Sequence, residues 1–394
     1  MYLAHLALNN FRTFRRLELD LQPGLHLIVG GNARGKTNLL EAVALLATTR
    51  SSRGGSDADL ISWNAVAEEP LPAARVLGQV EGAGGRTTVE VAVIARASTA
   101  GAPFVASRRF RVNGVARRAS DLIGRLRVVM FGADDLQIVD GPPAGRRRYL
   151  DITISQFDPA YVRALQRYSR VLLQRNSLLR RLQERRGLPD ELDFWDDELA
   201  AAGAVVVDGR RRSLVALGQG AAGRYEELSP AGARLEVCYR PALPVPLVAT
   251  LDQGGLEERL REALKEHRRA DIQAGVTRIG PHRDDIAFLL GGHDAGAFGS
   301  RGEQRTVALA LRLAEVELST RRTGEPPVLL LDDILSELDR ERRERVLAAA
   351  YGVDQAIITT ADPDRPSVAD LPEARRYRLD DGRLTPEASS ATSP

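Results

Sequence analysis

The sequence predicts an α/β protein in which a mixed sheet with helices is interrupted by an inserted α-helical lobe. Three observations indicate this class. Near the N-terminus, a short apolar run is followed by a glycine-rich loop and then by a helical segment. Near the C-terminus, a second apolar run ends in two aspartates. Between these runs, residues 160–186 are expected to form a helix, because their apolar residues recur at helical spacing. A second helical stretch is expected from about residue 193 to 227.

The glycine-rich loop GGNARGKT, residues 30–37, matches the phosphate-binding pattern G-x-x-x-x-G-K-[ST]. Residues 25–29 before it predict a buried strand and residues 38–46 after it predict a helix, which is the context that the pattern needs. Backbone N–H groups of such a loop, together with the helix N-terminus, surround phosphate oxygens. We therefore expect nucleotide binding by Gly30, Gly31, Asn32, Ala33, Arg34, Gly35, Lys36 and Thr37.

Two side chains of this loop carry chemistry. Lys36 is expected to reach the β- and γ-phosphates, and the Thr37 hydroxyl is expected to bind Mg²⁺. The alternative is a chance match in a glycine-rich chain. The composition argues against chance, because the 55 basic residues include lysine only at Lys36 and Lys265. A compact ammonium fits between phosphates where a planar guanidinium does not.

Composition sets the broad class. A chain of 394 residues allows two or three domains, and 43% hydrophobic with 27% charged residues is typical of soluble proteins. The single cysteine, Cys238, allows no internal disulfide and fits a reducing compartment. We see no signal peptide and no apolar run long enough to cross a bilayer, so we expect a cytoplasmic protein without a membrane partner.

Alternation of apolar and polar residues predicts a hairpin of residues 2–9 and 15–21. The same pattern predicts a small antiparallel sheet of residues 75–81, 87–96 and 107–112. Residues 50–72 have no such periodicity and are expected to form a loop. A further strand is expected at residues 127–131, and a Gly-Pro-Pro sequence then separates two helices.

The two helical stretches in the middle of the chain predict a short antiparallel arm. From residue 146 to 186 the sequence holds eleven arginines and three acidic residues, a net charge of +8. Such a run is either a solvated helix surface or a site for a polyanion, and both interpretations stay open.

The C-terminal part of the chain alternates strands and helices. The expected strands are residues 235–239, 286–290, 328–331 and 356–360, and the expected helices are residues 256–269, 306–319 and 340–350. The tail, residues 385–394, is poor in hydrophobic residues and is predicted to be disordered.

Two motifs in this part are candidates for chemistry. In VLLLDD, residues 328–333, a buried strand would deliver carboxylates beside the phosphates, with Asp332 on Mg²⁺ and Asp333 polarising the attacking water. An acidic turn after a core strand is the alternative. In GSRGEQR, residues 299–305, Ser300 and Gly302 at a helix start offer a second anion site. An ordinary helix cap is the alternative there.

This order of motifs, followed by SELD at residues 336–339, resembles the head of ABC-type P-loop ATPases of the SMC kind. In those heads, two copies enclose two nucleotides between them. The resemblance implies that Asp339 lies at the dimer seam and that a signature segment acts in trans on the partner's ATP. That segment consists of Ser300, Arg301, Gly302, Glu303 and Gln304.

The resemblance becomes more specific with NNFRTF, FGADDLQIVDGPPAGRRRYLD, TRIGPHRDD, GSRGEQRTVALALRLAE and LLLDDILSELD. Across nearly the whole chain these segments resemble the bacterial RecF recombination-mediator family. The resemblance implies ATP and Mg²⁺ as cofactors, slow DNA-stimulated hydrolysis, and an ATP-dependent homodimer on duplex or gapped DNA with little sequence preference. It also implies that RecO and RecR act with the dimer to place RecA on gapped DNA.

The resemblance also divides the chain. It implies an ATPase head made of residues 1–150 and 276–384 around a helical lobe of residues 151–275. Arg12 resembles an arginine near the nucleotide, Asn32 is a candidate γ-phosphate contact, and Gln137 is a candidate for the glutamine loop. Asp333 departs from the glutamate of transporters, and no histidine follows the strand at residues 356–360. A transporter motor, a structural SMC tether and an adaptor without hydrolysis are the alternative functions.

Overall fold

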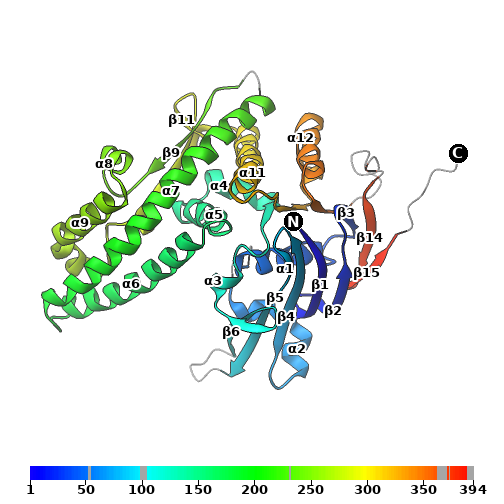
Figure 1. The fold of residues 1–394 in the computed structure, drawn as a ribbon, viewed down its shortest axis with the longest axis horizontal. Coiled ribbons are helices and arrows are strands. Elements are labelled where there is room, and N and C mark those ends of the chain that lie inside the picture. The colour runs from blue at the N-terminus through cyan, green and yellow to red at the C-terminus, as the bar shows by residue number, and fades with distance from the viewer. Residues whose placement is uncertain (52–54, 98–103, 230–231, 362–370, 372, 388–394) are drawn as a thin grey trace. The chain divides into compact units, whose positions relative to one another are not determined.

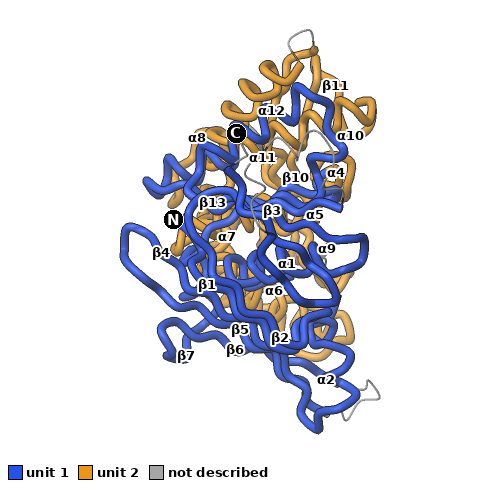
Figure 2. The backbone as a smooth tube through the Cα atoms, turned by 90° about the vertical axis from the view of Figure 1, so that its right-hand side faces the viewer, with its two compact units in different colours: residues 1–135, 315–394 blue, residues 136–314 orange. Residues whose placement is uncertain are grey.

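The computed structural model describes residues 1–394 except 52–54, 98–103, 230–231, 362–370, 372 and 388–394 (Figure 1). The chain forms two compact units (Figure 2). Unit 1 consists of residues 1–135 and 315–394, and unit 2 consists of residues 136–314. The predicted limits of the head and the lobe stay a prediction.

Unit 1 contains a six-stranded sheet in the order β15-β14-β3-β13-β12-β8. Neighbouring strands are parallel except for β15, which pairs antiparallel with β14. All six residues of β13 and four of the five in β12 are buried, as expected for the centre of a parallel sheet. The strands are β3 (Gly24–Val29), β8 (Val128–Phe131), β12 (Val328–Asp332), β13 (Gln355–Thr360), β14 (Arg375–Asp380) and β15 (Arg383–Pro386).

This sheet confirms the predicted strands at residues 25–29, 127–131, 328–331 and 356–360. Because β3 and β12 run parallel to β13, their carboxyl ends lie at one edge of the sheet. The phosphate loop follows β3 and the aspartates follow β12, so the fold brings the two motifs to the same edge.

The second sheet of unit 1 is antiparallel throughout, in the order β2-β1-β4-β5-β6-β7. It confirms the predicted hairpin and small sheet and adds the short strand β7. The strands are β1 (Tyr2–Phe11), β2 (Phe14–Asp20), β4 (Ala73–Gly82), β5 (Gly85–Ala97), β6 (Phe104–Val112) and β7 (Val115–Arg117).

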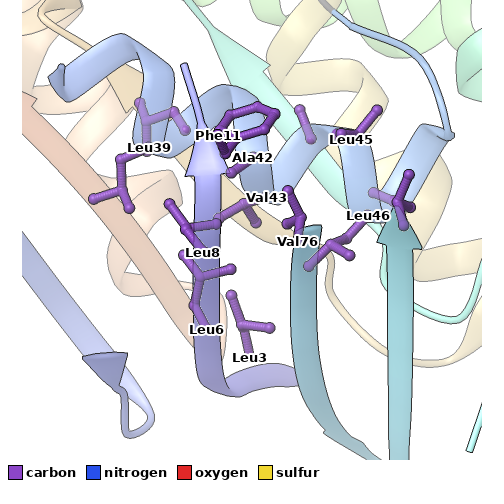
Figure 3. Close-up of a cluster of buried hydrophobic side chains, with 14 of the residues drawn as sticks. Leu3, Leu6, Leu8, Phe11, Leu39, Ala42, Val43, Leu45, Leu46 and Val76 are labelled. Carbon is purple, nitrogen blue, oxygen red and sulfur yellow. The ribbon is translucent and has the colours of Figure 1, made fainter. Parts of the chain in front are cut away.

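Helix α1 (Lys36–Thr48) packs into the main hydrophobic core of unit 1. Figure 3 shows its side chains Leu39, Val43 and Leu46 against apolar side chains of β1 and β4. Eleven of its thirteen residues are buried, so the helix that carries Lys36 is fixed on several sides. The core also includes Leu330 and Ile357 of the parallel sheet.

The expected loop at residues 50–72 is wrong in part. The structure has a 3₁₀ turn, η1 (Asp57–Leu60), and a helix, α2 (Trp63–Glu68). Both elements are shorter than two helical turns, so they leave no periodicity in the sequence. The segment is tied to the β1–β2 hairpin, because the N–H of Ser62 donates to the carbonyl of Asn10 at 2.7 Å.

Unit 2 contains the predicted arm. Helices α6 (Pro159–Gln183) and α7 (Leu192–Leu228) pack together with α9 (Gln253–Ala274), as Figure 1 shows. Gly209 of α7 allows close packing, because a Cβ there would lie 2.6 Å from the Tyr161 ring. A three-stranded sheet accompanies the arm: β9 (Leu235–Arg240), β10 (Asp285–Leu290) and β11 (His293–Asp294).

The remaining helices follow the sequence closely. The Gly-Pro-Pro break separates α4 (Leu136–Asp140) from α5 (Pro143–Ser155), as predicted. Helix α11 (Arg301–Thr323) begins directly after Ser300, and α12 (Arg340–Tyr351) begins directly after Asp339. The short elements are α3 (Ala119–Leu122), η2 (Ala133–Asp135), η3 (Pro189–Glu191), α8 (Val245–Thr250), η4 (Pro281–Arg283), α10 (Ala295–Phe298) and η5 (Ile334–Ser336).

The predicted disordered tail is corrected at its start. Thr385 and Pro386 belong to β15 and pair with Arg378 and Tyr377 of β14. Proline is tolerated there because β15 is an edge strand. Residues 388–394 of the predicted tail lie outside the described residues. Among the described helices, none is long and apolar enough to span a membrane.

Candidate nucleotide site

The loop between β3 and α1 needs its glycines for backbone reasons. Gly35 has a φ of 101°, and a Cβ there would lie 2.6 Å from Oγ1 of Thr13. A Cβ on Gly30 would lie 2.6 Å from the carbonyl oxygen of Leu379. The N-cap residue of α1 is Gly35, which has no side chain to cap the helix. The loop therefore presents backbone at a helix start, which is where anions bind.

Lys36 is folded into this loop. Its Nζ donates to the carbonyl oxygens of Gly30 at 2.7 Å and of Gly31 at 3.0 Å. Burial lowers the pKa of Lys36, and the carboxylates of Asp333 and Asp332 oppose that shift. The ammonium is thus held inside the loop that would surround the phosphates.

Asp332 at the end of β12 meets two hydroxyl groups. Oγ1 of Thr37 donates to its Oδ1 at 3.2 Å, and Oγ1 of Thr359 donates to the same oxygen at 2.9 Å. A hydroxyl and a carboxylate oxygen at this separation suit Mg²⁺, which prefers oxygen ligands and keeps water and phosphate in its remaining positions. The described residues hold no group of three or more His, Cys, Asp or Glu side chains that could bind a metal alone.

Asp333 has a left-handed backbone, with a φ of 53°. Such a conformation is costly for a residue with a side chain and persists where the surroundings determine it. Its N–H donates to Thr359 at the carbonyl oxygen (3.2 Å) and at Oγ1 (3.1 Å), and its own carbonyl accepts from Oγ of Ser336 at 2.7 Å. The backbone of Asp333 is thus fixed beside Asp332.

Thr359 is the site residue that the sequence motifs do not mark. Its side chain contacts Asp332 and the backbone of Asp333, and the residue is buried. The family resemblance directs attention to a histidine after this strand, and the chain has none there. The available signal was the pair of threonines that ends strand β13 directly after its apolar run, residues 356–358.

The tip of the loop is exposed. Asn32, Ala33 and Arg34 lie on the surface, and Ala33 has a φ of 62°. Arg34 forms ion pairs with Asp381 and, at 3.5 Å, with Asp380. Arg12 forms a bidentate ion pair with Glu41, and its predicted place near the nucleotide stays a prediction.

The predicted signature lies in unit 2, at the start of α11. Ser300 and Glu303 form a reciprocal cap: Oγ and the N–H of Ser300 both donate to Oε2 of Glu303 at 2.8 Å. These bonds lower the pKa of Glu303. Gly302 is open, because a Cβ there would have nothing within 4 Å among the atoms described.

Two signature residues have contacts within unit 2. Arg301 pairs with Asp140 at 2.6 Å. Gln304 is buried, and its Nε2 donates to the carbonyls of Ala295 and Gly296, both at 3.1 Å. Ser300, Arg301, Gly302 and Glu303 are exposed, whereas Gln304 holds the helix start in place. Gln137 is an exposed residue of α4.

Asp339 is the N-cap of α12, and its Oδ1 accepts from the N–H of Arg342 at 3.0 Å. This contact gives Asp339 a local structural role within unit 1. Its place at a dimer seam stays a prediction.

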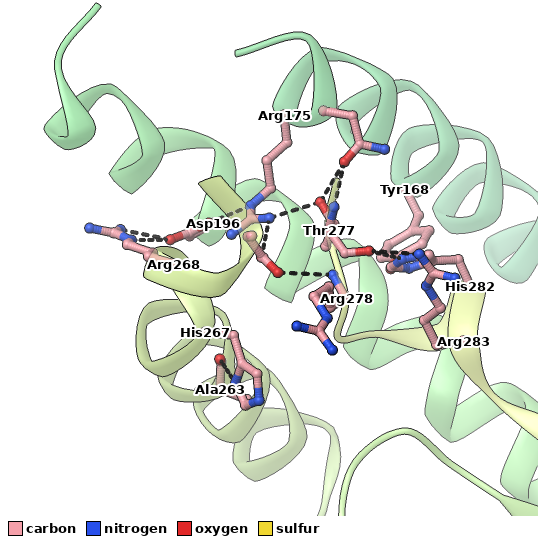
Figure 4. Close-up of polar contacts among 12 residues, drawn as sticks. Tyr168, Arg175, Asp196, Ala263, His267, Arg268, Thr277, Arg278, His282 and Arg283 are labelled. Carbon is pink, nitrogen blue, oxygen red and sulfur yellow. Dashed lines mark hydrogen bonds and ion pairs between the residues drawn. The ribbon is translucent and has the colours of Figure 1, made fainter. Parts of the chain in front are cut away.

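The arginine-rich run is partly used inside unit 2. Arg175 is fully buried; its Nε donates to Asp196 and its Nη1 to Asp271, both at 2.7 Å (Figure 4). Arg146 makes a bidentate pair with Asp285 at 2.7 and 2.9 Å. The net charge of the run therefore overstates the positive charge that faces solvent.

The GPHRDD segment also has a structural role. The rings of Tyr168 and His282 lie together, with Nδ1 of His282 2.6 Å from the Tyr168 hydroxyl (Figure 4). Nε2 of His282 is 2.9 Å from the carbonyl oxygen of Thr277. Burial lowers the pKa of His282 to about 4, so the ring is neutral. Asp284, also buried, accepts hydrogen bonds from Tyr239 and Arg210.

Known proteins share this sequence and fold. The family model described as "RecF/RecN/SMC N terminal domain" matches residues 2–372. The DNA replication and repair protein RecF of Chloroflexus aurantiacus is 48% identical over 391 residues, which cover 98% of this chain and 99% of that protein. RecF of Heliobacterium modesticaldum is 38% identical, with 98% and 99% covered.

Two solved structures are informative. The recombination mediator RecF with ATP, described within the RecFOR pathway, is 31% identical with a TM-score of 0.85, and 98% of each chain is covered. An Smc head bound to the C-terminal winged-helix domain of ScpA is 17% identical with a TM-score of 0.53, covering 98% of this chain and 97% of that one. The latter likeness concerns the fold alone. Together they confirm the predicted fold class, a P-loop head of the ABC/SMC type with a helical insertion.

Proposed function

This chain belongs to the RecF family of DNA replication and repair proteins, and on that premise we propose that it is an ATP-dependent switch of recombinational repair. In this proposal the chain binds ATP with Mg²⁺, hydrolyses it slowly, and dimerises on duplex or gapped DNA. DNA stimulates the hydrolysis. The observation that carries the proposal is the meeting of Thr37, Asp332 and Thr359 at the edge where the phosphate loop follows β3.

The residues of unit 1 take the following roles. The loop N–H groups bind the phosphates, and Lys36 exchanges the carbonyls of Gly30 and Gly31 for phosphate oxygens. Thr37 and Asp332 would hold Mg²⁺, which neutralises phosphate charge when it is bound. Asp333 accepts a hydrogen bond from the attacking water and orients it toward the γ-phosphate.

The signature would act between two copies of the chain. The Ser300 hydroxyl now donates to Glu303, and its exposure leaves it free to donate to a phosphate on the partner instead. ATP would then join two heads, and hydrolysis would release them. The related RecF–ATP structure is that of a recombination mediator of the RecFOR pathway, which supports RecO and RecR as partners here. That the dimer helps to place RecA on gapped DNA is part of the proposal and follows from the family resemblance.

DNA binding in this proposal uses arginine contacts to phosphates, which give little sequence preference and a strong dependence on salt. The tether alternative is not favoured, because α6 and α7 have only 25 and 37 residues. A transporter motor is not favoured either, because the relatives named above are DNA replication and repair proteins.

The test is steady-state ATP hydrolysis with duplex and gapped DNA at two salt concentrations. We expect DNA to raise the rate and added salt to remove that effect. Lys36→Ala should abolish ATP binding, whereas Lys265→Ala, which changes the other lysine of the chain, should not. A rate of ATP hydrolysis that does not change when DNA is added would contradict the proposal. An ATP affinity of Lys36→Ala equal to that of the unchanged chain would contradict it as well.

A further inference from the structure

A buried carboxylate lies behind the phosphate loop in unit 1. Glu41 belongs to α1, and its side chain is fully buried. A buried carboxylate is costly unless its charge is paired and its oxygens are hydrogen-bonded. Arg12 provides both, because its Nε donates to Oε2 at 3.0 Å and its Nη2 to Oε1 at 2.8 Å. Oγ of Ser51 adds a third bond, to Oε1 at 2.5 Å.

Arg12 is held from a second side as well. It lies in the turn between β1 and β2, with a φ of 53°, and its N–H donates to the carbonyl of Leu60 at 3.0 Å. Its Nη1 donates to the carbonyl of Asp59 at 2.8 Å. The side-chain bonds to described residues use three of the five guanidinium N–H groups, so two remain for another acceptor. The side chain is 18% exposed, which leaves it within reach of a ligand from solvent.

The turn that carries Arg12 lies against the end of the phosphate loop. Oγ1 of Thr13 accepts from Nδ2 of Asn38 at 3.1 Å. The same turn fills the space at Gly35, where a Cβ would lie 2.6 Å from Thr13 and 3.3 Å from the Phe14 ring. Arg12 directly precedes Thr13, so the fold brings a fixed cation to the flank of the loop.

We propose that Glu41 is a positioning residue that holds Arg12 ready to contact a bound nucleotide, with Ser51 orienting Glu41. This inference rests on the proposed function, which supplies the nucleotide. An unrestrained arginine loses side-chain freedom each time it binds a ligand. The bidentate pair removes that cost at binding, because the guanidinium is already ordered in the folded protein.

A double-mutant cycle tests this role. Glu41→Gln keeps the size of the side chain and one acceptor oxygen but removes the charge and the bidentate pair. We expect Glu41→Gln and Arg12→Ala each to weaken ATP affinity about tenfold in isothermal titration, the loss of one charge-assisted hydrogen bond. Because Glu41 acts through Arg12, the double variant should bind ATP no more weakly than Arg12→Ala. Ser51→Ala should show the same pattern with a smaller effect.

The control is an ion pair in the same unit but away from the loop. Glu325→Gln removes the ion pair between Glu325 and Nη2 of Arg127, which are 3.0 Å apart. Arg127 directly precedes β8, so this pair lies at the amino end of the parallel strands. We expect that variant to bind ATP like the unchanged chain.

Two outcomes would overturn the role of Glu41. The first is a folded Glu41→Gln variant with unchanged ATP affinity, and the second is a double variant in which the two losses add. If Glu41→Gln does not fold, the double-mutant cycle of Ser51→Ala with Arg12→Ala takes its place. Losses of ATP affinity that add in that double variant would then overturn the role of Glu41. Failure of the proposed function would give a different result. In that case the unchanged chain would not bind ATP, or Lys36→Ala would bind it as tightly as the unchanged chain.

Discussion

Replacing Thr359 by valine tests the site at the residue that sequence motifs do not mark. Valine has the same β-branched shape as threonine, so the buried position in β13 stays filled and only the hydroxyl is lost. The change removes the hydroxyl that donates to Oδ1 of Asp332 at 2.9 Å. It also removes one of two acceptors for the N–H of Asp333, which keeps the Thr359 carbonyl at 3.2 Å.

The magnitude follows from these contacts. A hydrogen bond to a charged group contributes about 1.5–3 kcal/mol. Asp332 keeps the Thr37 hydroxyl at 3.2 Å, and Asp333 keeps a backbone partner, so the lower end of that range applies. About 1.4 kcal/mol corresponds to a tenfold change in an equilibrium constant. We therefore expect the Mg²⁺ concentration for half-maximal ATP hydrolysis to rise about tenfold.

The assay is ATP hydrolysis at saturating ATP with Mg²⁺ varied, together with thermal unfolding to confirm the fold. Thr153→Val is the matched control, since Thr153 is a buried threonine of α5 in unit 2 whose hydroxyl donates to the carbonyl of Tyr149 at 3.0 Å. A folded Thr359→Val protein with unchanged Mg²⁺ dependence and unchanged kcat would refute the role given to this hydroxyl.

Three further predictions address other parts of the chain. Ser300→Arg should leave ATP binding intact and prevent ATP-dependent dimers in sedimentation experiments; normal dimers would contradict action in trans. Asp333→Asn should lower kcat by at least about tenfold and prolong the dimer, and normal turnover would remove Asp333 from the water site. The pKa of His282 falls from 6.5 to about 4 on folding, so the unfolded chain binds the proton more readily and stability is lost as pH falls from 6.5 to 4. That shift corresponds to about 3 kcal/mol. Between pH 6.5 and 4, the free energy of unfolding measured with denaturant should therefore fall by about 3 kcal/mol less in His282→Gln than in the unchanged chain. An equal fall in both proteins would show that His282 is not responsible.

Local patterns were sufficient for most of the fold. Strands β3, β12 and β13 are apolar runs bounded by polar residues, and α1 follows a loop whose pattern fixes its start. Strand β14 was missed although Tyr377 and Leu379 alternate with charged residues in it. Its pairing with β3 joins segments more than three hundred residues apart, and no local rule predicts such a partner.

The candidate site likewise contains residues that short sequence motifs predict and residues that only the folded structure identifies. Lys36, Thr37 and Asp332 were predictable because their residue types stand at fixed positions in short motifs. Thr359 and Glu41 were not, because each is defined by the groups that it meets. The Thr37–Asp332 contact spans 295 positions in the chain, and the spacing within either motif says nothing about which hydroxyl meets which carboxylate.

The arginine-rich run shows why charge counted along a chain misleads. The acidic partners of Arg175 are Asp196 and Asp271, and both lie outside the window that gave a net charge of +8. Leaving a buried charge of this kind without its partner costs about 3–5 kcal/mol, whereas an exposed ion pair contributes about 0–1 kcal/mol. Arg175 is therefore committed to the packing of α6 and cannot turn outward to a phosphate. In the proposed function, any contact of the arm with DNA would have to come from arginines that the fold leaves exposed, and on α6 these include Arg163, Arg170 and Arg180.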